Sequence, residues 1–232
     1  MAASAVMIAP ERAMVFVDAM NLYESLGAAG INTNVDYNKL AMKLVGSQRR
    51  LIRCHVYTGA YDQGREPAKY AGQVRFFNRV HLMPFVTLKS RPLLFREGTF
   101  IQKGVDTLIA TDMVSMAFLN HYDIAFLVSG DGDLAPAVEA LKAAGKQIIV
   151  ASSPRSRSTA LGNAADHEVV VDGLFTCRGA IRFGVAHSYP LPPLSRVTSA
   201  SARISCAVDC TCTPSPTPAA GFRRRRQQES SR

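Results

Sequence analysis

The sequence predicts a three-layer α/β domain with a mainly parallel central sheet. Short apolar runs bounded by turn residues recur along the first three quarters of the chain. Runs of this kind are typical of strands that are buried on both faces of a parallel sheet. Between them lie stretches with apolar residues at helical spacing, and this alternation implies right-handed crossovers between parallel strands.

The expected elements follow from these two patterns. Strands are predicted over residues 14–18, 51–57, 124–128 and 147–151. Helices are predicted over residues 37–45, 66–79 and 133–144, and Gly145 is a favourable stop for the last of them. Turn-forming pairs at Arg91-Pro92 and Glu97-Gly98 interrupt residues 81–103, so that segment is interpreted as a strand pair or a β-rich insertion.

Composition divides the chain into a domain over residues 12–175 and a tail over residues 176–232. The tail is rich in Pro, Ser and Arg and lacks apolar periodicity, so disorder is expected there. It holds nine Arg against two acidic residues and therefore carries +7 of the formal +9 charge. The domain is thus nearly neutral, and net charge alone says little about its ligand.

The composition also bears on the setting of the protein. No stretch approaches the ~18 uninterrupted apolar residues of a membrane span, so no membrane association is expected. The five cysteines are scattered and odd in number, which is not the pattern of a disulfide framework. A reduced, cytoplasmic location is the resulting expectation.

Aspartates stand at the ends of two predicted strands. Asp18 closes the first strand, and Asp131 and Asp133 follow the third. Asp106 is expected in the first turn of a helix that begins at the same edge of the sheet. Ligands of open parallel sheets bind beyond the carboxyl ends of the strands, near a switch in strand order. We therefore expect these four carboxylates to meet in one pocket.

Carboxylates packed together repel one another, and a divalent cation removes that cost. A hard, all-oxygen ligand set without His or Cys favours Mg²⁺ or Mn²⁺ over zinc. The expected metal ligands are Asp18, Asp106, Asp131 and Asp133. A metal held in this way can orient a water, lower its pKa and neutralise charge on a phosphodiester, which predicts phosphodiester hydrolysis.

Each of these residues also has a purely structural interpretation, because Asp often caps helices or forms turns. Asp133 is the weakest candidate, since it occupies the N-cap position ahead of Leu134. Asn21 is either a donor behind the site or a helix-start residue. Ser129 either binds a metal-bound water or fits a tight turn.

Asp112 is a separate case, because it falls within the apolar stripe of the same helix as Asp106. A carboxylate on an apolar face needs a partner. Six residues at a rise of ~1.5 Å place it roughly 9 Å from Asp106 along the helix. We interpret Asp112 first as a buried supporting residue and only second as a metal ligand. The expected stripe consists of Val105, Leu108, Ile109, Met116 and Leu119.

Basic and aromatic residues near the acids are candidates for substrate contact. Lys103 and Arg96 are the expected contacts for a phosphate backbone. Tyr23 and Tyr61 are candidates for stacking on bases, whereas Tyr57 is expected in the core.

Three stretches of the sequence resemble a known family. V-D-A-M-N-L from Val17 to Leu22 resembles the opening D-x-x-N motif of NYN domains, a branch of the PIN-like nucleases. K-G-V-D ending at Asp106, together with Asp112, and S-G-D-G-D-L from Ser129 resemble later motifs of the LabA-like subgroup. The resemblance spans about residues 12–175.

The resemblance implies a PIN-like fold and Mg²⁺-dependent ribonuclease activity. It assigns the catalytic acids to Asp18, Asp106 and Asp131, with Asp133, Asn21 and Ser129 in support. The substrate expected is RNA, single-stranded rather than duplex, and association into a homodimer is an open alternative.

Two other functions compete with a metal-dependent (endo)ribonuclease. One is an RNA-binding or regulatory module that retains the acidic pocket but has little or no catalytic activity. The other is a phosphatase of the haloacid dehalogenase type. That class is disfavoured because Ala19-Met20 follows Asp18, where a second Asp two residues on is wanted.

Overall fold

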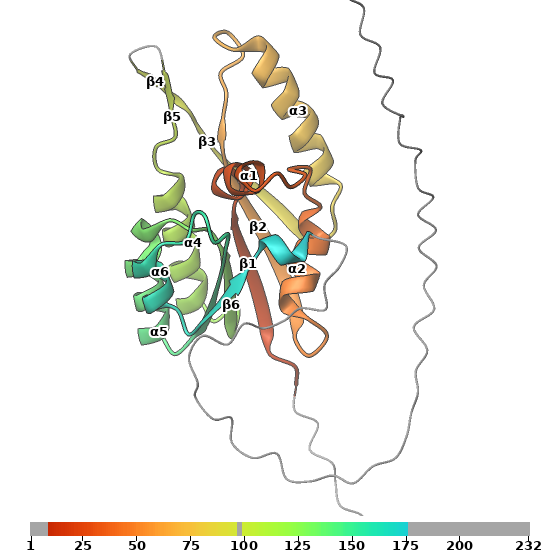
Figure 1. The fold of residues 1–232 in the computed structure, drawn as a ribbon. Helices are drawn as coiled ribbons and strands as arrows, with labels where there is room; N and C mark the ends of the chain where they lie inside the picture. The colour runs from red at the N-terminus through yellow and green to blue at the C-terminus, as the bar shows by residue number, and fades with distance from the viewer. Residues whose placement is uncertain (1–8, 97–98, 176–232) are drawn as a thin grey trace, which may run out of the picture. The chain divides into compact units, whose positions relative to one another are not determined.

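The computed structural model describes residues 9–96 and 99–175 of the chain (Figure 1). The side chains of Arg96, Thr99 and Phe100 also lie outside the description. The tail expected over residues 176–232 falls outside the described residues as well. Within them, no helix combines the length and the apolar character that crossing a membrane requires.

Six parallel strands form the central sheet, in the order β3-β2-β1-β6-β7-β8. The strands are β1 (Arg12–Asp18), β2 (Arg50–Ala60), β3 (Val86–Pro92), β6 (Ile124–Val128), β7 (Gln147–Ser152) and β8 (His167–Val170). Strands β4 (Leu94–Arg96) and β5 (Thr99–Ile101) form a separate antiparallel pair. The prediction of an α/β fold with a mainly parallel sheet is therefore confirmed.

Helices cover both faces of this sheet. They are α1 (Ala19–Ala28), α2 (Tyr37–Val45), α3 (Pro67–His81), α4 (Val105–Phe118), α5 (Ala135–Ala143) and α6 (Thr159–Ala164), with 3-10 turns η1 (Gly132–Leu134) and η2 (Asp172–Leu174). Helices α1, α2 and α3 pack on one face, and α4, α5 and α6 pack on the other. The order of the strands reverses between β1 and β6, so the sheet has its switch point at their carboxyl ends.

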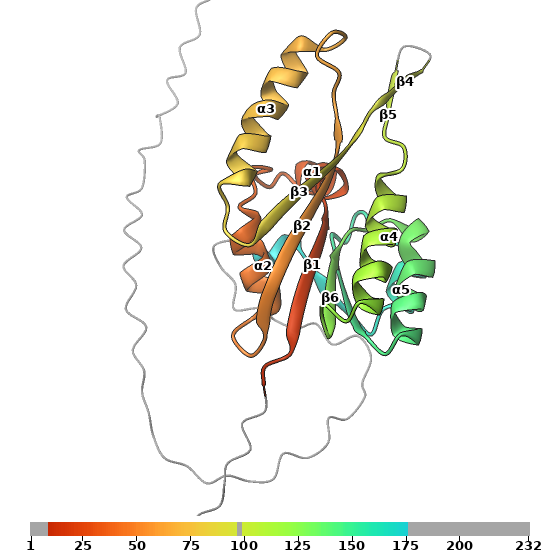
Figure 2. The ribbon, with the colours of Figure 1, turned by 180° about the vertical axis from the view of Figure 1, so that it is seen from behind.

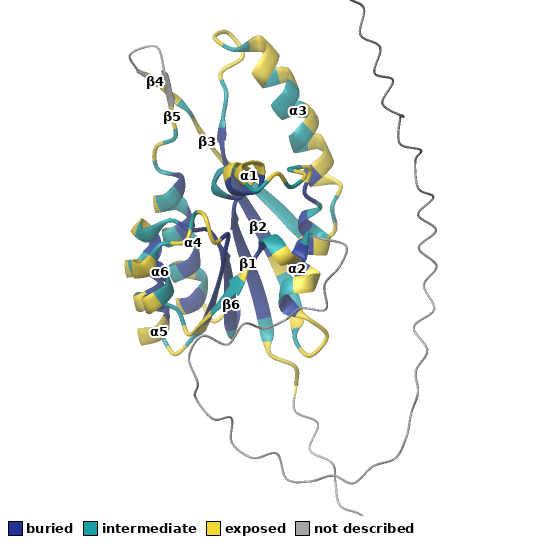
Figure 3. Ribbon diagram, in the orientation of Figure 1, coloured by how far each residue is buried: buried dark blue, intermediate teal, exposed yellow. Residues whose placement is uncertain are grey.

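The side chains of β1 alternate between the two halves of the core. Ala13, Val15 and Val17 pack with α1 and α2, whereas Met14 and Phe16 pack with α4 and α5. This is the period of two that a strand imposes on its side chains. The central strands are buried along most of their length (Figure 3), as expected for a sheet covered on both faces.

Two parts of the sheet differ from the prediction. Residues 81–103 do contain a strand pair, β4 and β5, but they also supply β3, which joins the main sheet parallel to β2. Strand β8 was not predicted, and neither was α6. Both are short, at four and six residues, and pairing with β7 or packing on α5 defines them more than their own pattern does.

Helix α4 buries a narrower stripe than expected. Its buried residues are Val105, Ile109, Met113 and Ala117, which are spaced four apart. Leu119 was expected to extend the stripe, but the helix ends at Phe118 and Leu119 is 66% exposed. Leu119 therefore does not contribute to the core.

The loop between β6 and η1 packs directly against the loop between β7 and α6. A Cβ added at Gly130 would lie 1.9 Å from the carbonyl oxygen of Ser156. One added at Gly132 would lie 2.7 Å from Oγ of Ser158. Glycine at 130 is therefore required by the close approach of a neighbouring backbone.

This contact predicts a position-specific effect of added volume. Gly130→Ala is expected to lower the free energy of unfolding by about 2 kcal/mol, because the clash is with backbone rather than with a flexible side chain. Gly27→Ala in α1 is the control: its Cβ would meet only Thr33 Cγ2 at 3.9 Å, and helix propensity predicts a gain of up to about 1 kcal/mol. Denaturant unfolding measures both. Equal stability of Gly130→Ala and the parent would contradict the packing described.

Candidate active site

Asp18 both ends β1 and begins α1. Its Oδ1 accepts hydrogen bonds from the backbone N–H groups of Met20 and Asn21, each at 3.1 Å, and so caps the helix. The side chain of Asp18 is only 3% exposed. Because both bonds use Oδ1, the second carboxylate oxygen is left for another partner.

One hydrogen bond holds the loop after β6 against the first turn of α1, and two more fix the shape of that loop. Asn21 Oδ1 accepts from the backbone N–H of Gly130 at 2.9 Å. Ser129 Oγ accepts from the N–H of Asp131 at 3.1 Å, and Asp131 Oδ1 accepts from the N–H of Asp133 at 3.0 Å. Asn21 thus acts across the switch point, and Ser129 stabilises the turn that carries Asp131.

The position expected for the helix cap was wrong. Asp133 was interpreted as an N-cap, but the residue that caps is Asp131, and Asp133 lies inside the 3-10 turn η1 with an exposed side chain. Helix α5 begins only at Ala135. Asp131 therefore caps η1, whereas the N-cap position of α5 is Leu134, whose side chain makes no capping hydrogen bond.

Four carboxylates lie within electrostatic reach of one another at the carboxyl edge of the sheet. The pKa of Asp18 is raised to about 6, mainly by burial and in part by the charges of Asp106 and Asp131, while the two backbone hydrogen bonds lower it. Burial also raises the pKa of Asp106, with contributions from Asp131 and Asp133. We call Asp18, Asp106, Asp131 and Asp133 the aspartate cluster. Over residues 9–96 and 99–175, none of the four forms an ion pair with Lys or Arg.

The cluster suits a hard cation without forming a complete cage for one. In the described part of the chain, no three His, Cys, Asp or Glu side chains are close enough to hold a metal ion together. Mg²⁺ commonly takes only one or two protein carboxylates and fills its remaining positions with waters and substrate phosphates. Carboxylates that repel one another, with no His or Cys among them, fit that mode and do not fit zinc.

Asp112 has two partners and lies apart from the cluster. Its Oδ2 accepts from the Tyr57 hydroxyl at 2.8 Å and is 2.5 Å from Lys89 Nζ. Burial, followed by this hydrogen bond, raises the pKa of Tyr57. The arrangement agrees with the interpretation of Asp112 as a supporting residue. The sequence did not predict that Lys89 is the partner of Asp112, because only the register of β3 brings the two residues together.

Of the residues expected to contact the substrate, the structure describes some side chains but not that of Arg96. Lys103 is exposed three residues before Asp106, at the entry to α4. The backbone of Arg96 belongs to β4, but its side chain lies outside the description. Tyr23 is 56% exposed on α1, and Tyr57 is fully buried as expected.

Comparison with known proteins places this fold and site in a family. The model of the NYN domain matches residues 12–172, and the chain belongs to the NYN domain family. The expected family is thereby confirmed.

Comparison with solved structures gives an informative likeness. A crystal structure of a protein of unknown function from Vibrio parahaemolyticus is similar to this chain, with 28% identity and a TM-score of 0.57 over 72% of this chain and 96% of that one. A putative UDP-N-acetylglucosamine 2-epimerase from Listeria monocytogenes reaches only 12% identity and a TM-score of 0.38, over 70% of this chain and 39% of that one. The second likeness is too low to carry an argument. No curated protein matched the chain.

The raised pKa of Asp18 predicts a stability that depends on pH. The native carboxyl binds its proton more tightly than the unfolded one, so the free energy of unfolding falls as pH rises from about 4 to about 6. Asp18→Asn keeps a good N-cap and cannot ionise. Without divalent cations, this variant is expected to exceed the parent in stability by about 1–3 kcal/mol above pH 6, and to lose that gain near pH 4.

Asp36→Asn provides the control for this prediction. Asp36 also caps a helix, since its Oδ1 accepts from the backbone N–H of Lys39 at 3.0 Å, but it is not part of the aspartate cluster. Unfolding in urea at several pH values measures both variants. A gain that is the same at pH 4 and pH 8 would mean that Asp18 is not strained by its charge.

Proposed function

We propose that this NYN domain is a metal-dependent ribonuclease. The bond hydrolysed is the phosphodiester of RNA. The metal is Mg²⁺ or Mn²⁺, bound directly by one or two carboxylates among Asp18, Asp106 and Asp131, with waters in its other positions and Asp133 in support. One observation carries the proposal: separate elements bring carboxylates to the switch point of the sheet, where burial and repulsion raise the pKa values of Asp18 and Asp106. Such an arrangement is costly unless a cation or a proton relieves it.

The hydrogen bonds around the site support this role. Asp18 and Asp131 each use Oδ1 to accept backbone N–H bonds, which fixes the direction of the remaining oxygen. Asn21 joins the two loops through Gly130, so the acids keep their spacing. A bound divalent ion would supply an acidified water and would neutralise charge on the phosphodiester. Preorganised ligands of this kind lose little freedom when the ion and the substrate arrive.

Family membership supports nuclease chemistry, because NYN domains are a branch of the PIN-like nucleases. The K-G-V-D and S-G-D-G-D motifs favour the LabA-like subgroup within that family. Single-stranded RNA as the substrate and the cytoplasm as the location belong to the same proposal, and a homodimer stays an open alternative.

A second candidate is an RNA-binding module that keeps the acidic site and turns over little or no substrate. The observation that favours it is the incomplete ligand set of the described residues. The two functions differ in whether RNA and a metal together lead to cleavage, so one assay separates them.

The proposal predicts metal-dependent cleavage. The full-length protein with Mn²⁺ or Mg²⁺ is expected to degrade labelled single-stranded RNA, and EDTA is expected to stop the reaction. Asp18→Asn and Asp131→Asn should each lower the rate on the order of a hundredfold or more, since each removes a charged ligand. Glu139→Gln on the exposed side of α5 is the matched control and should leave the rate unchanged.

Two outcomes would count against ribonuclease activity at this site. Variants that cleave as fast as the parent would show that the activity arises elsewhere. A parent that binds RNA but cleaves none with either metal would favour the RNA-binding module.

Metal binding itself is predicted to depend on pH. Ligand carboxyls must lose their protons to bind a cation, and the pKa of Asp18 is about 6. Mn²⁺ is therefore expected to raise the melting temperature of the parent strongly at pH 8 and little at pH 5. A hundredfold excess over the dissociation constant corresponds to about 2.7 kcal/mol of stabilisation. The shift should be largely absent in Asp18→Asn and retained in Glu139→Gln; an equal shift in all three proteins would contradict the proposed metal site.

A further inference from the structure

We propose that the RNA strand leaves the aspartate cluster toward β3, across the N-terminal end of α4. Three cations line this path, which we call the edge track: Lys89, Arg91 and Lys103. This inference takes RNA as the ligand from the proposed function. It does not require that the RNA be cleaved.

The register of the sheet places the edge track level with the active site. Asp18 of β1 pairs with Tyr57 of β2, and Tyr57 pairs with Lys89 of β3. Lys89 is therefore two strands from Asp18, about 10 Å to the side. Its contact with Asp112 shows that its side chain lies on the α4 face of the sheet.

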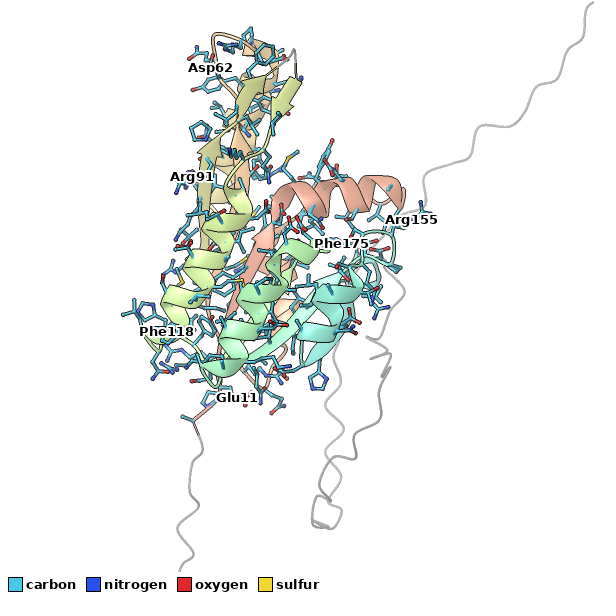
Figure 4. All side chains as sticks on the ribbon, turned by 90° about the vertical axis from the view of Figure 1, so that its left-hand side faces the viewer. Glu11, Asp62, Arg91, Phe118, Arg155 and Phe175 are labelled. Atoms are coloured by element: carbon cyan, nitrogen blue, oxygen red, sulfur yellow. The ribbon has the colours of Figure 1, made fainter. Side chains whose placement is uncertain are left out.

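Arg91 shares this face with Lys89, because residues two apart on a strand point to the same side. It is exposed, and it lies near the N-terminal end of α4, whose opposite end carries Phe118 (Figure 4). Lys103, also exposed, precedes that end of the helix. Lys89, Arg91 and Lys103 therefore flank the same side of the aspartate cluster.

Lys89 is held in position rather than free. Its ammonium pairs with Asp112, and the Tyr57 hydroxyl donates to the same carboxylate oxygen. The Lys89 side chain still has 29% of its surface exposed, against 17% for Asp112. An ammonium has three donors, so a phosphate oxygen can bind beside the carboxylate. A cation fixed before binding loses less conformational entropy when the ligand arrives.

Cations on the opposite side of the cluster are engaged differently. Arg155 donates to the backbone oxygen of Ala28 at 2.5 Å, and Arg157 is paired with Glu168 at 2.5 Å. Arg91 and Lys103 have neither an acidic partner nor a side-chain hydrogen bond within the described residues, whereas Arg155 is held by a backbone oxygen and Arg157 by a carboxylate. The guanidinium of Arg91 and the ammonium of Lys103 are therefore open to phosphate groups, and phosphate contacts position a nucleic acid on a protein.

The edge of the sheet leaves room for such a path. Strand β3 pairs only with β2 in the central sheet, and in the view from behind it runs between α3 and the β4-β5 pair (Figure 2). Helix α3 packs on the other face of these two strands. Removing charges from β3 can therefore be compared with removing the same number of charges from α3 on the opposite face.

The test measures RNA binding in the absence of cleavage. In full-length protein carrying Asp18→Asn, without divalent cations, the affinity for a short labelled single-stranded RNA is measured at several KCl concentrations. Lys89→Gln with Arg91→Gln is expected to weaken binding on the order of tenfold at low salt. The slope of log affinity against log salt should fall by about 1.4, since each contact with a single strand contributes about 0.7.

The control removes the same charge from the opposite face. Arg75→Gln with Arg79→Gln on α3 is expected to change affinity less than twofold, and Lys89→Arg should bind as the parent does. Equal losses in the two double variants would indicate net charge alone and overturn the edge track. So would unchanged binding of Lys89→Gln with Arg91→Gln, or a parent that does not bind the RNA.

Replacing Lys89 leaves Asp112 without its cation. Melting temperatures therefore show whether the Lys89 variant is still folded. If that double variant melts early, Arg91→Gln alone decides the question, because Arg91 is exposed; its slope should fall by about 0.7. A different result would refute nuclease activity and leave the edge track intact: the parent would bind RNA through the edge track and never cleave it. Cleavage that requires Asp18, with binding indifferent to Lys89 and Arg91, would overturn the edge track alone.

Discussion

Burial of the Asp18 carboxyl at the end of β1 is the constraint on which the rest of the site depends. The residue is 3% exposed, and its nearest charged neighbours include Asp106 and Asp131. Two backbone hydrogen bonds from α1 keep the side chain in place although burial and repulsion disfavour its charge. The cluster is thus a strained local feature, of the kind found where binding or catalysis takes precedence over stability.

The topology of the sheet makes this strain possible. Strand β1 is central, and the crossovers on its two sides cover opposite faces. The loops after β1 and β6 therefore meet at one edge, and Asn21 locks them together through Gly130. The tight contact of Gly130 with Ser156 also holds the loop after β6 against the loop after β7.

Acidic or basic residues of the same type differ in this structure according to the charged groups that lie beside them. Asp106 and Asp112 belong to the same helix, yet one repels other carboxylates while the other is paired with Lys89. Within the nearly neutral domain, Arg155 and Arg157 near α6 are bound to acceptors, whereas Arg91 and Lys103 beside β3 and α4 have no acidic partner among the described residues. The local field at the site is therefore set by pairing and exposure rather than by net charge.

The sequence alone determined the buried strand over residues 124–128, the helix over residues 37–45 and the acids that end strands, because these rest on local periodicity and strong boundaries. Tertiary structure decided what depends on partners distant in the chain. Residues of β3 became a strand by pairing with β2, and Lys89 reached Asp112 only through strand register. Asp133 does not cap α5, because the turn η1, capped by Asp131, precedes that helix. Contacts of this kind depend on how separate elements pack, which no local window of residues contains.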